Sequence, residues 1–235
     1  MTDEKTEGKT AKAGKVVKVV KAARRPEVRI PPLVGFAEGA LRPDGDYDGV
    51  DFAGLDLSGQ DGGGARFLDC ALTDCGLDET RLRKARLIDS RLTGVRGVGT
   101  DLAEAGLRDV EVGEPRLGGV QLHGASLERV WLRGGKLDVP NLRGARLRDV
   151  VFEGCVLVEP DFQGATLERV EFVDCVLRDA DFTAARLTDV DLRTAAELGI
   201  ARGVESLSGA VVSPTQLLDL APVFAAQLGV RVAEA

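Results

Sequence analysis

Aromatic residues and histidine are scarce in this sequence. The chain has one Tyr, one Trp and one His, and aromatic residues make up 4% of its 235 residues. Because His123 is the only histidine, a Ser-His-Asp or Cys-His catalytic arrangement would have to use it. His123 follows an apolar residue and precedes Gly124, where we expect it to point into solvent. We therefore predict that the protein is not an enzyme.

Long apolar runs are also missing, and we expect no leader sequence. No stretch approaches the roughly 18 consecutive apolar residues of a membrane span. The N-terminal segment is rich in lysine and lacks the apolar core of a signal peptide. We therefore expect a cytoplasmic protein without membrane contact.

The four cysteines, Cys70, Cys75, Cys155 and Cys175, fit that compartment as reduced, buried thiols. Stacked thiols could bind a metal, but no further ligands converge on them, and a metal site normally needs three or four. No phosphate-binding or dinucleotide-binding motif appears either. We predict no metal, no cofactor and no small-molecule substrate.

What the sequence has in abundance is a five-residue repeat. Every fifth residue from Tyr47 to Leu192 is large and apolar, with only Gly62 and Gly97 as exceptions, and no insertion breaks the register. The position two residues earlier is small from Ala65 onward, and glycine is frequent two residues after the apolar centre. Neither a helix nor an ordinary strand has a period of five. A large and a small inward residue beside a glycine corner predict a narrow tube.

Individual repeats resemble those of a known family. Val-Asp-Phe-Ala-Gly (50–54), Pro-Asn-Leu-Arg-Gly (140–144) and Ala-Asp-Phe-Thr-Ala (180–184) are similar to the Ala-(Asp/Asn)-Leu-X-X consensus of bacterial pentapeptide-repeat proteins, over about 150 of 235 residues. The resemblance implies an all-β fold, a right-handed quadrilateral β-helix with four pentapeptides in each coil. Thirty pentapeptides predict about 7–8 coils. We assign residues 46–196 to this β-solenoid and residues 31–45 to an N-terminal cap.

The C-terminal segment, 197–235, is expected to close the solenoid with a short α-helix. Ser213 and Pro214 are typical of a helix start, and Gly229 is a plausible stop. Pro222 is expected to kink or split the helix near Leu220. One stripe of the helix carries Leu217, Leu220, Phe224 and Leu228. The resemblance implies that a helix of this kind pairs two rods end to end in the gyrase-interacting members of the family. Capping alone and a homodimer both remain open here.

The N-terminal segment has the opposite charge to the repeats. Residues 1–45 carry a net charge of +4, with lysines at 5, 9, 12, 15, 18 and 21 and arginines at 24, 25 and 29. A basic arm of this kind can touch nucleic acid or an anionic membrane. The Ala, Gly, Thr and Lys content favours a disordered solubilising tail over residues 1–30.

The remaining candidate for function is the surface of the solenoid. The whole chain has a net charge of −7, which argues against direct nucleic-acid binding, and residues 46–194 alone carry −9. One face gathers most of the excess negative charge, in Asp51, Asp74, Glu111, Glu114, Glu153, Glu171, Asp174 and Asp191, and is interrupted by Arg91, Arg133 and Arg193. Trp131, also on this face, is expected to be exposed.

These features predict a non-enzymatic protein that binds a protein partner through its surface. The family resemblance supplies an alternative, a DNA mimic that binds DNA gyrase and modulates its activity or protects it from quinolones. In that case carboxylates would meet the lysines and arginines that otherwise contact phosphates.

Overall fold

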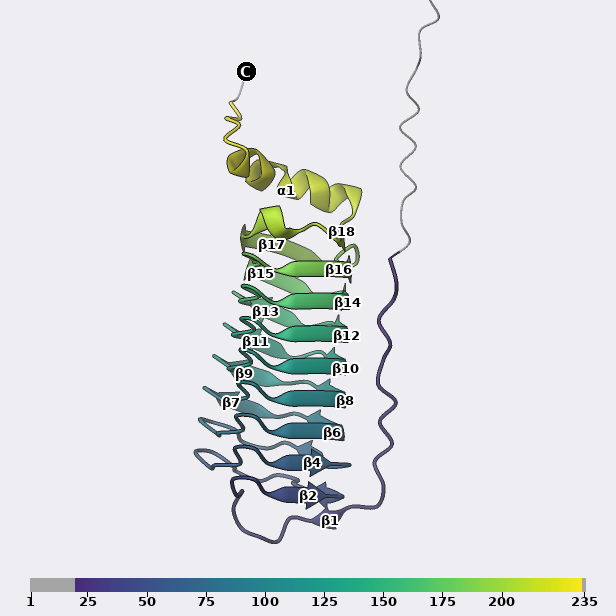
Figure 1. Cartoon of the computed structure of the whole chain (residues 1–235), viewed down its shortest axis with the longest axis vertical. Helices are drawn as coiled ribbons and strands as arrows, with labels where there is room; N and C mark the ends of the chain where they lie inside the picture. Colours follow the sequence, from purple (N-terminus) through teal and green to yellow (C-terminus); the bar gives the residue numbers. More distant parts are fainter. Residues whose placement is uncertain (1–19, 234–235) are drawn as a thin grey trace, which may run out of the picture.

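The structure is a computed structural model and describes residues 20–233. These residues form a parallel β-solenoid of about nine turns, closed at one end by helix α1, Pro214–Gln227 (Figure 1). The predicted all-β solenoid with a C-terminal helical cap is confirmed. The strands on the two faces of the larger sheet are β1 (Val34–Gly35), β2 (Asp46–Asp48), β3 (Val50–Asp51), β4 (Arg66–Leu68), β5 (Ala71–Thr73), β6 (Arg86–Thr93), β8 (Gly106–Gly113), β10 (Ser126–Arg133), β12 (Arg146–Glu153), β14 (Thr166–Val173), β16 (Arg186–Asp191) and β18 (Ala210–Val211). The smaller sheet contains β7 (Arg96–Val98), β9 (Arg116–Gly118), β11 (Lys136–Asp138), β13 (Val156–Val158), β15 (Val176–Asp181) and β17 (Glu197–Arg202).

Successive coils are stacked with an offset of 20 residues. Leu127 of β10 is aligned with Leu107 of β8 on one side and with Leu147 of β12 on the other. On the fourth face, isolated bridges such as Gln121 to Asn141 continue the same register. The five-residue period therefore places equivalent pentapeptides directly above one another.

The corners of the coils use the left-handed backbone conformation. Every fifth residue from Asp44 to Asp189 has a positive φ, and glycine occupies twelve of these positions while aspartate is the commonest alternative. Both residue types tolerate this region better than others do. Val139, with φ 47°, is the one β-branched residue among these thirty positions.

The interior is built from the apolar centres, as the repeat predicts. All the large centres are buried except Leu117 and Leu122, which are half-buried. Phenylalanines fill the later coils, where the Phe152 and Phe172 rings stack at 4.9 Å. The middle coils contain only Leu, Val and Gly centres, and an apolar cavity of about 60 Å³ lies there, lined by residues including Leu107, Val112 and Leu132.

The solenoid is longer than the expected 7–8 coils. At the start, β1 pairs with β3, and Phe36 packs against the rings of Tyr47 and Phe52. At the end, β17 and β18 pair with β15 and β16. Both added parts lack the strict five-residue spacing, so the repeat alone underestimates the number of turns.

Helix α1 closes the last coil. Ser213 and Gln216 form a capping box, because each side chain accepts a hydrogen bond from the backbone N–H of the other. Gln216 Nε2 also donates to the Leu192 carbonyl at 2.7 Å, and Leu220 is the buried apolar side chain of the helix. The helix runs through Pro222 without a split, and Gly229, with φ 70°, follows its end.

Candidate protein-interaction surface

Residues 20–30 run as an extended segment along the outside of the solenoid, and we call them the strap. They extend from the level of the last coils to the first coil, beside the stacked strands of the larger sheet (Figure 1). Val20 lies near Leu187 and Val211 there. The sequence favoured a disordered tail over residues 1–30; the strap lies instead against the solenoid, and residues 1–19 fall outside the described residues.

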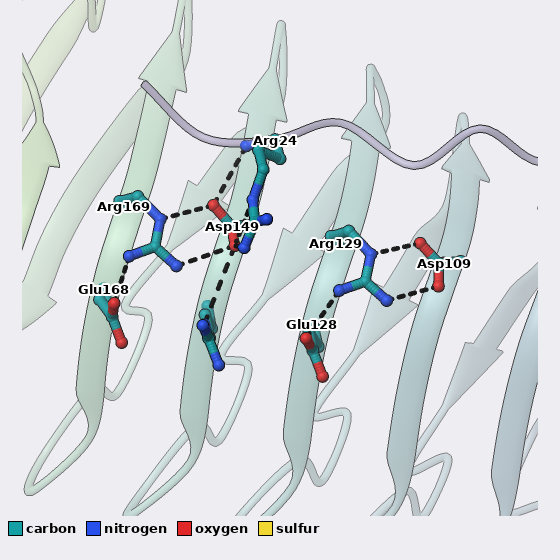
Figure 2. Close-up of polar contacts among 8 residues, drawn as sticks. Arg24, Asp109, Glu128, Arg129, Asp149, Glu168 and Arg169 are labelled. Carbon is teal, nitrogen blue, oxygen red and sulfur yellow. Dashed lines mark hydrogen bonds and ion pairs between the residues drawn. The ribbon is translucent and has the colours of Figure 1, made fainter. Parts of the chain in front are cut away.

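The strap is fastened at Asp149, a corner residue of β12. Arg24 donates from Nη2 to Asp149 Oδ2 at 3.0 Å and from its backbone N–H to Oδ1 at 3.2 Å. Arg169 of β14 forms a bidentate pair with the same carboxylate, at 2.7 and 2.9 Å. Figure 2 shows Arg24 reaching from the strap onto this carboxylate, beside Arg169. The Asp149 side chain has 0% exposure.

The charge of Asp149 is stabilised despite its burial. Burial alone raises the pKa of this carboxyl, but the hydrogen bonds from Arg169 and Arg24 outweigh burial. The net result is a pKa well below the ordinary value for aspartate. Asp149 is therefore an anion at neutral pH, and it attracts the arginine of the strap.

A second, similar cluster lies two coils earlier. Arg129 of β10 pairs with Asp109 of β8 at 2.6 and 2.7 Å, and it also contacts Glu128 (Figure 2). Asp109 and Arg129 line a hollow together with Arg24, Arg25, Pro26 and Glu27 of the strap. The two clusters therefore form the wall along which the strap passes.

Sequence reasoning missed these clusters, although a signal was present. Arg-Asp (108–109), Glu-Arg (128–129), Arg-Asp (148–149) and Glu-Arg (168–169) occupy the same two slots in four successive coils. The 20-residue offset places Asp109 against Arg129 and Asp149 against Arg169, each arginine one coil after its aspartate. The net charge of a face does not reveal this alternation, because the charge of each aspartate cancels that of its arginine partner.

Trp131 anchors the strap at its second arginine. Arg25 lies over the indole ring at 4.4 Å from the centroid, and Arg133 lies at 4.5 Å. Trp131 Nε1 donates to Glu153 at 3.0 Å, and Arg25 pairs with the same carboxylate at 3.1 Å. Trp131 was expected to be exposed; it is half-buried, because strap and solenoid both contact it.

Apolar contact accompanies these polar bonds. Val151 occupies the outward column of the larger sheet between Trp131 and Glu171, yet its exposure is 0%. Pro26 and Val28 of the strap are buried as well. The strap therefore covers part of the solenoid surface rather than touching it only through charges.

The predicted acidic residues divide into two groups in the structure. The first group lies on or near the strands. In it, Glu171 accepts a hydrogen bond from the Ala23 backbone N–H at 2.7 Å, and Glu153 forms an ion pair with Arg25. Glu111 pairs with Arg91 and Asp191 with Arg193, whereas Asp51 is half-buried on β3. The second group, Asp74, Glu114 and Asp174, lies at the next corner, is exposed, and forms no ion pair within residues 20–233.

The predicted dimerisation stripe is also divided. Leu220 is buried and Phe224 packs partly against the core, so these two side chains cap the solenoid. Leu217 and Leu228 remain exposed, at 51% and 78%, and Leu218 beside them is 73% exposed. Leu217, Leu218 and Leu228 are therefore the apolar side chains that the helix presents outward.

The side chains considered for chemistry are dispersed. The cysteines are buried and unpaired. Burial raises the pKa of Cys70 to about 11, which disfavours its thiolate at neutral pH. His123 was expected to be solvated, but it is half-buried, and its Nδ1 is buried without a hydrogen-bond partner. Within residues 20–233 no group of three or more His, Cys, Asp or Glu residues could hold a metal ion, and no helix there could cross a membrane.

Comparison with known proteins identifies the family to which the repeats belong. A family model described as a pentapeptide repeat region matches residues 65–142, and a model of eight pentapeptide repeats matches 141–172 and 161–195. Together they span more than half of the chain. The search of curated proteins finds no match.

Two solved structures are similar to this chain at low sequence identity. QnrB1, a plasmid-mediated fluoroquinolone resistance protein, is 20% identical with a TM-score of 0.49, and the match covers 82% of this chain and 96% of QnrB1. HetL, a pentapeptide repeat protein involved in heterocyst differentiation regulation in the cyanobacterium Nostoc sp. strain PCC 7120, is 20% identical with a TM-score of 0.37, over 72% of this chain and 90% of HetL. At these values the likenesses carry no information about partners.

Proposed function

Because the chain belongs to the pentapeptide-repeat family, we propose that it is a cytoplasmic, non-enzymatic protein that binds a protein partner through the outer surface of its solenoid. One observation carries this proposal. The surface already binds an extended polypeptide, its own strap, through Asp149, Trp131, Glu153 and Glu171. It does so with charge-assisted hydrogen bonds, a cation–π contact and buried apolar area, which are ordinary means of protein recognition.

The exposed corner residues Asp74, Glu114 and Asp174 are the first candidates for partner contact. They keep a left-handed backbone in a row along one edge, and their carboxylates are unpaired within the described chain. Steering of a basic partner by such a row depends on ionic strength.

The experiment is affinity capture from the native host, with two triple variants of the full chain. Changing Asp74, Glu114 and Asp174 to Ala should remove the captured partner if this corner binds it. Changing Glu79, Glu159 and Asp179 to Ala removes the same charge from exposed corner positions with the same backbone conformation, and should leave capture unchanged. Equal capture by both variants would contradict the assignment of this corner, and no specific capture by any form of the protein would contradict the proposed function.

A gyrase-binding DNA mimic is the second candidate, and the acidic face is what favours it. Internal arginines and the strap neutralise part of that face, which is why we place this function second. A supercoiling assay with DNA gyrase distinguishes the two. Inhibition or quinolone protection at micromolar protein, lost in the Asp74, Glu114, Asp174 variant, would support the mimic, whereas no effect would exclude it.

A further inference from the structure

The strap has the properties of a ligand bound to a site rather than of an added strand. It forms no β-ladder with the solenoid. Its backbone donates to two carboxylates, Glu171 and Asp149, and its Val28 carbonyl accepts from Arg91 at 3.4 Å. The remaining contacts come from the Arg24 and Arg25 side chains and from buried Pro26 and Val28.

The receiving side of this contact is built into the solenoid. The Asp149 carboxylate is held by Arg169, and the Trp131 ring is held by Arg133 and by its hydrogen bond to Glu153. These bonds orient the carboxylate and the ring without help from the strap. The site is therefore preorganised for an arginine at each of two neighbouring positions of an extended chain.

The strap and the solenoid are complementary in charge. Residues 20–30 contain Lys21, three arginines and one acidic residue, Glu27, while the surface beneath offers Asp149, Glu153 and Glu171. The strap is tethered to this site, so a partner segment must compete with a high effective concentration, commonly on the order of millimolar for short flexible links.

From these observations we infer that the surface beneath the strap is the binding site for an extended, arginine-bearing segment of a partner protein, and that the strap occupies this site in cis as a competitor. The inference rests on the proposed protein-binding function and names the chemistry of the partner. Such a partner carries two adjacent arginines followed by small apolar residues in an extended conformation.

Trp131 provides a direct readout, because it is the only tryptophan in the chain and lies beneath Arg25. In the full-length Arg24→Glu, Arg25→Glu variant the strap should leave, and the tryptophan emission should shift to longer wavelength as water reaches the ring. The matched control is Lys21→Glu, Arg29→Glu, which changes the charge of the strap equally. Lys21 is exposed and forms no ion pair with the solenoid, and Arg29 pairs only weakly with Glu27. The control should keep the wild-type emission.

The competition is tested with a synthetic peptide that copies residues 20–30. Titrated into the Arg24→Glu, Arg25→Glu protein, it should bind one-to-one and restore the wild-type emission. It should bind the wild-type protein at least about tenfold more weakly, because the tethered strap occupies the site. Asp149→Asn in the receiving protein should reduce peptide affinity, and higher salt should do the same.

Four results would overturn the inference. These are no binding of the peptide to the released protein, equal peptide affinity for wild-type and released proteins, unchanged tryptophan emission on release, and an equal response of the Lys21→Glu, Arg29→Glu control. Circular dichroism of each variant establishes that the solenoid is intact. If the peptide fails to bind while affinity capture through the Asp74 corner succeeds, the inference fails and the proposed function stands.

Discussion

The corner residues are where single side chains decide the stability of a coil. Each corner requires a left-handed backbone, which costs a non-glycine residue roughly 1–2 kcal/mol, and a β-branched residue tolerates it least. Val139 is such a residue, with φ 47° and 52% exposure, so its side chain contributes little burial in return.

We therefore expect Val139→Gly to raise the free energy of unfolding by about 1 kcal/mol. The matched reverse change is Gly144→Val. Gly144 has φ 61°, and an added Cβ meets no atom within 4 Å, so the variant introduces backbone strain without a clash. Chemical denaturation followed by circular dichroism measures both. An unchanged or lower stability of Val139→Gly would show that the left-handed corner is not strained by valine.

Asp149 and Asp109 allow the strap contact to be separated from the contact within the solenoid. Asp149→Asn leaves Arg169 with a poorer partner and loses the bonds from Arg24, and we expect a loss of about 3 kcal/mol. Asp109→Asn disturbs an equivalent bidentate pair with Arg129, at a site that is 20% exposed and accepts no hydrogen bond from Arg24, so its loss should be smaller. Equal losses would mean that the strap adds nothing to stability.

The lowered pKa of Asp149 predicts an acid dependence of the same contact. A carboxyl whose pKa is lower in the folded than in the unfolded state contributes stability above its unfolded pKa of about 3.9. That contribution is lost as the pH falls from about 4 through the lower folded value. Tryptophan emission should therefore show strap release in strong acid but not at pH 5–7, and release at pH 6 would contradict the assignment.

At the scale of elements, helix α1 performs two separable tasks. Leu220, Phe224 and the capping box at Ser213 face the last coil, whereas Leu217, Leu218 and Leu228 face outward. The sequence placed Leu217, Leu220, Phe224 and Leu228 on one stripe because they share a helical face. How far the helix rotates against the coil decides which of them is covered, and no periodicity encodes that rotation.

If the outward residues pair two rods, Leu218→Glu with Leu228→Glu should convert a dimer to a monomer in analytical ultracentrifugation. The unfolding free energy of the monomer should hardly change, because both side chains are more than 70% exposed. Leu220→Ala is the contrasting variant, which should lose about 2–5 kcal/mol through the cavity it leaves. A wild-type protein that stays monomeric at all concentrations would exclude the pairing.

The strap is the element whose position could least be predicted from the sequence. The five-residue register is repeated thirty times, so it fixes the core, the corners and the stacking of Cys155 near Cys175 with little ambiguity. Residues 20–30 have no repeat, and their composition is typical of disorder. Their position depends on contacts with residues more than a hundred positions away, such as Ala23 with Glu171, and only the folded coils bring those residues together.

At the scale of the whole molecule, the packing of the core changes along the rod. Phenylalanine centres fill the later coils, while the leucine and valine centres of the middle coils leave the cavity beside Val112 and Leu132. Leu132 is aligned with Phe152, whose ring stacks on Phe172.

Leu132→Phe should extend this stack into the cavity and leave stability unchanged or raise it by about 1 kcal/mol. Leu157→Phe makes the same chemical change at a centre with 0% exposure that does not line the cavity, and it should lose about 1–3 kcal/mol through overpacking. Guanidinium chloride denaturation compares the two. A similar loss in both would show that the middle coils are as tightly packed as the later ones.

The path of the strap brings residue 20 to the same end of the rod as helix α1 (Figure 1). A tensile load applied between residues 20 and 233 would therefore act on the strap as on a zipper. It would break the contacts at Glu171, Asp149 and Trp131 one after another, at low force, before any coil is loaded. A load applied between residues 31 and 233 would instead pull along the full stack of coils. The protein would therefore begin to extend at a lower force under the first load than under the second.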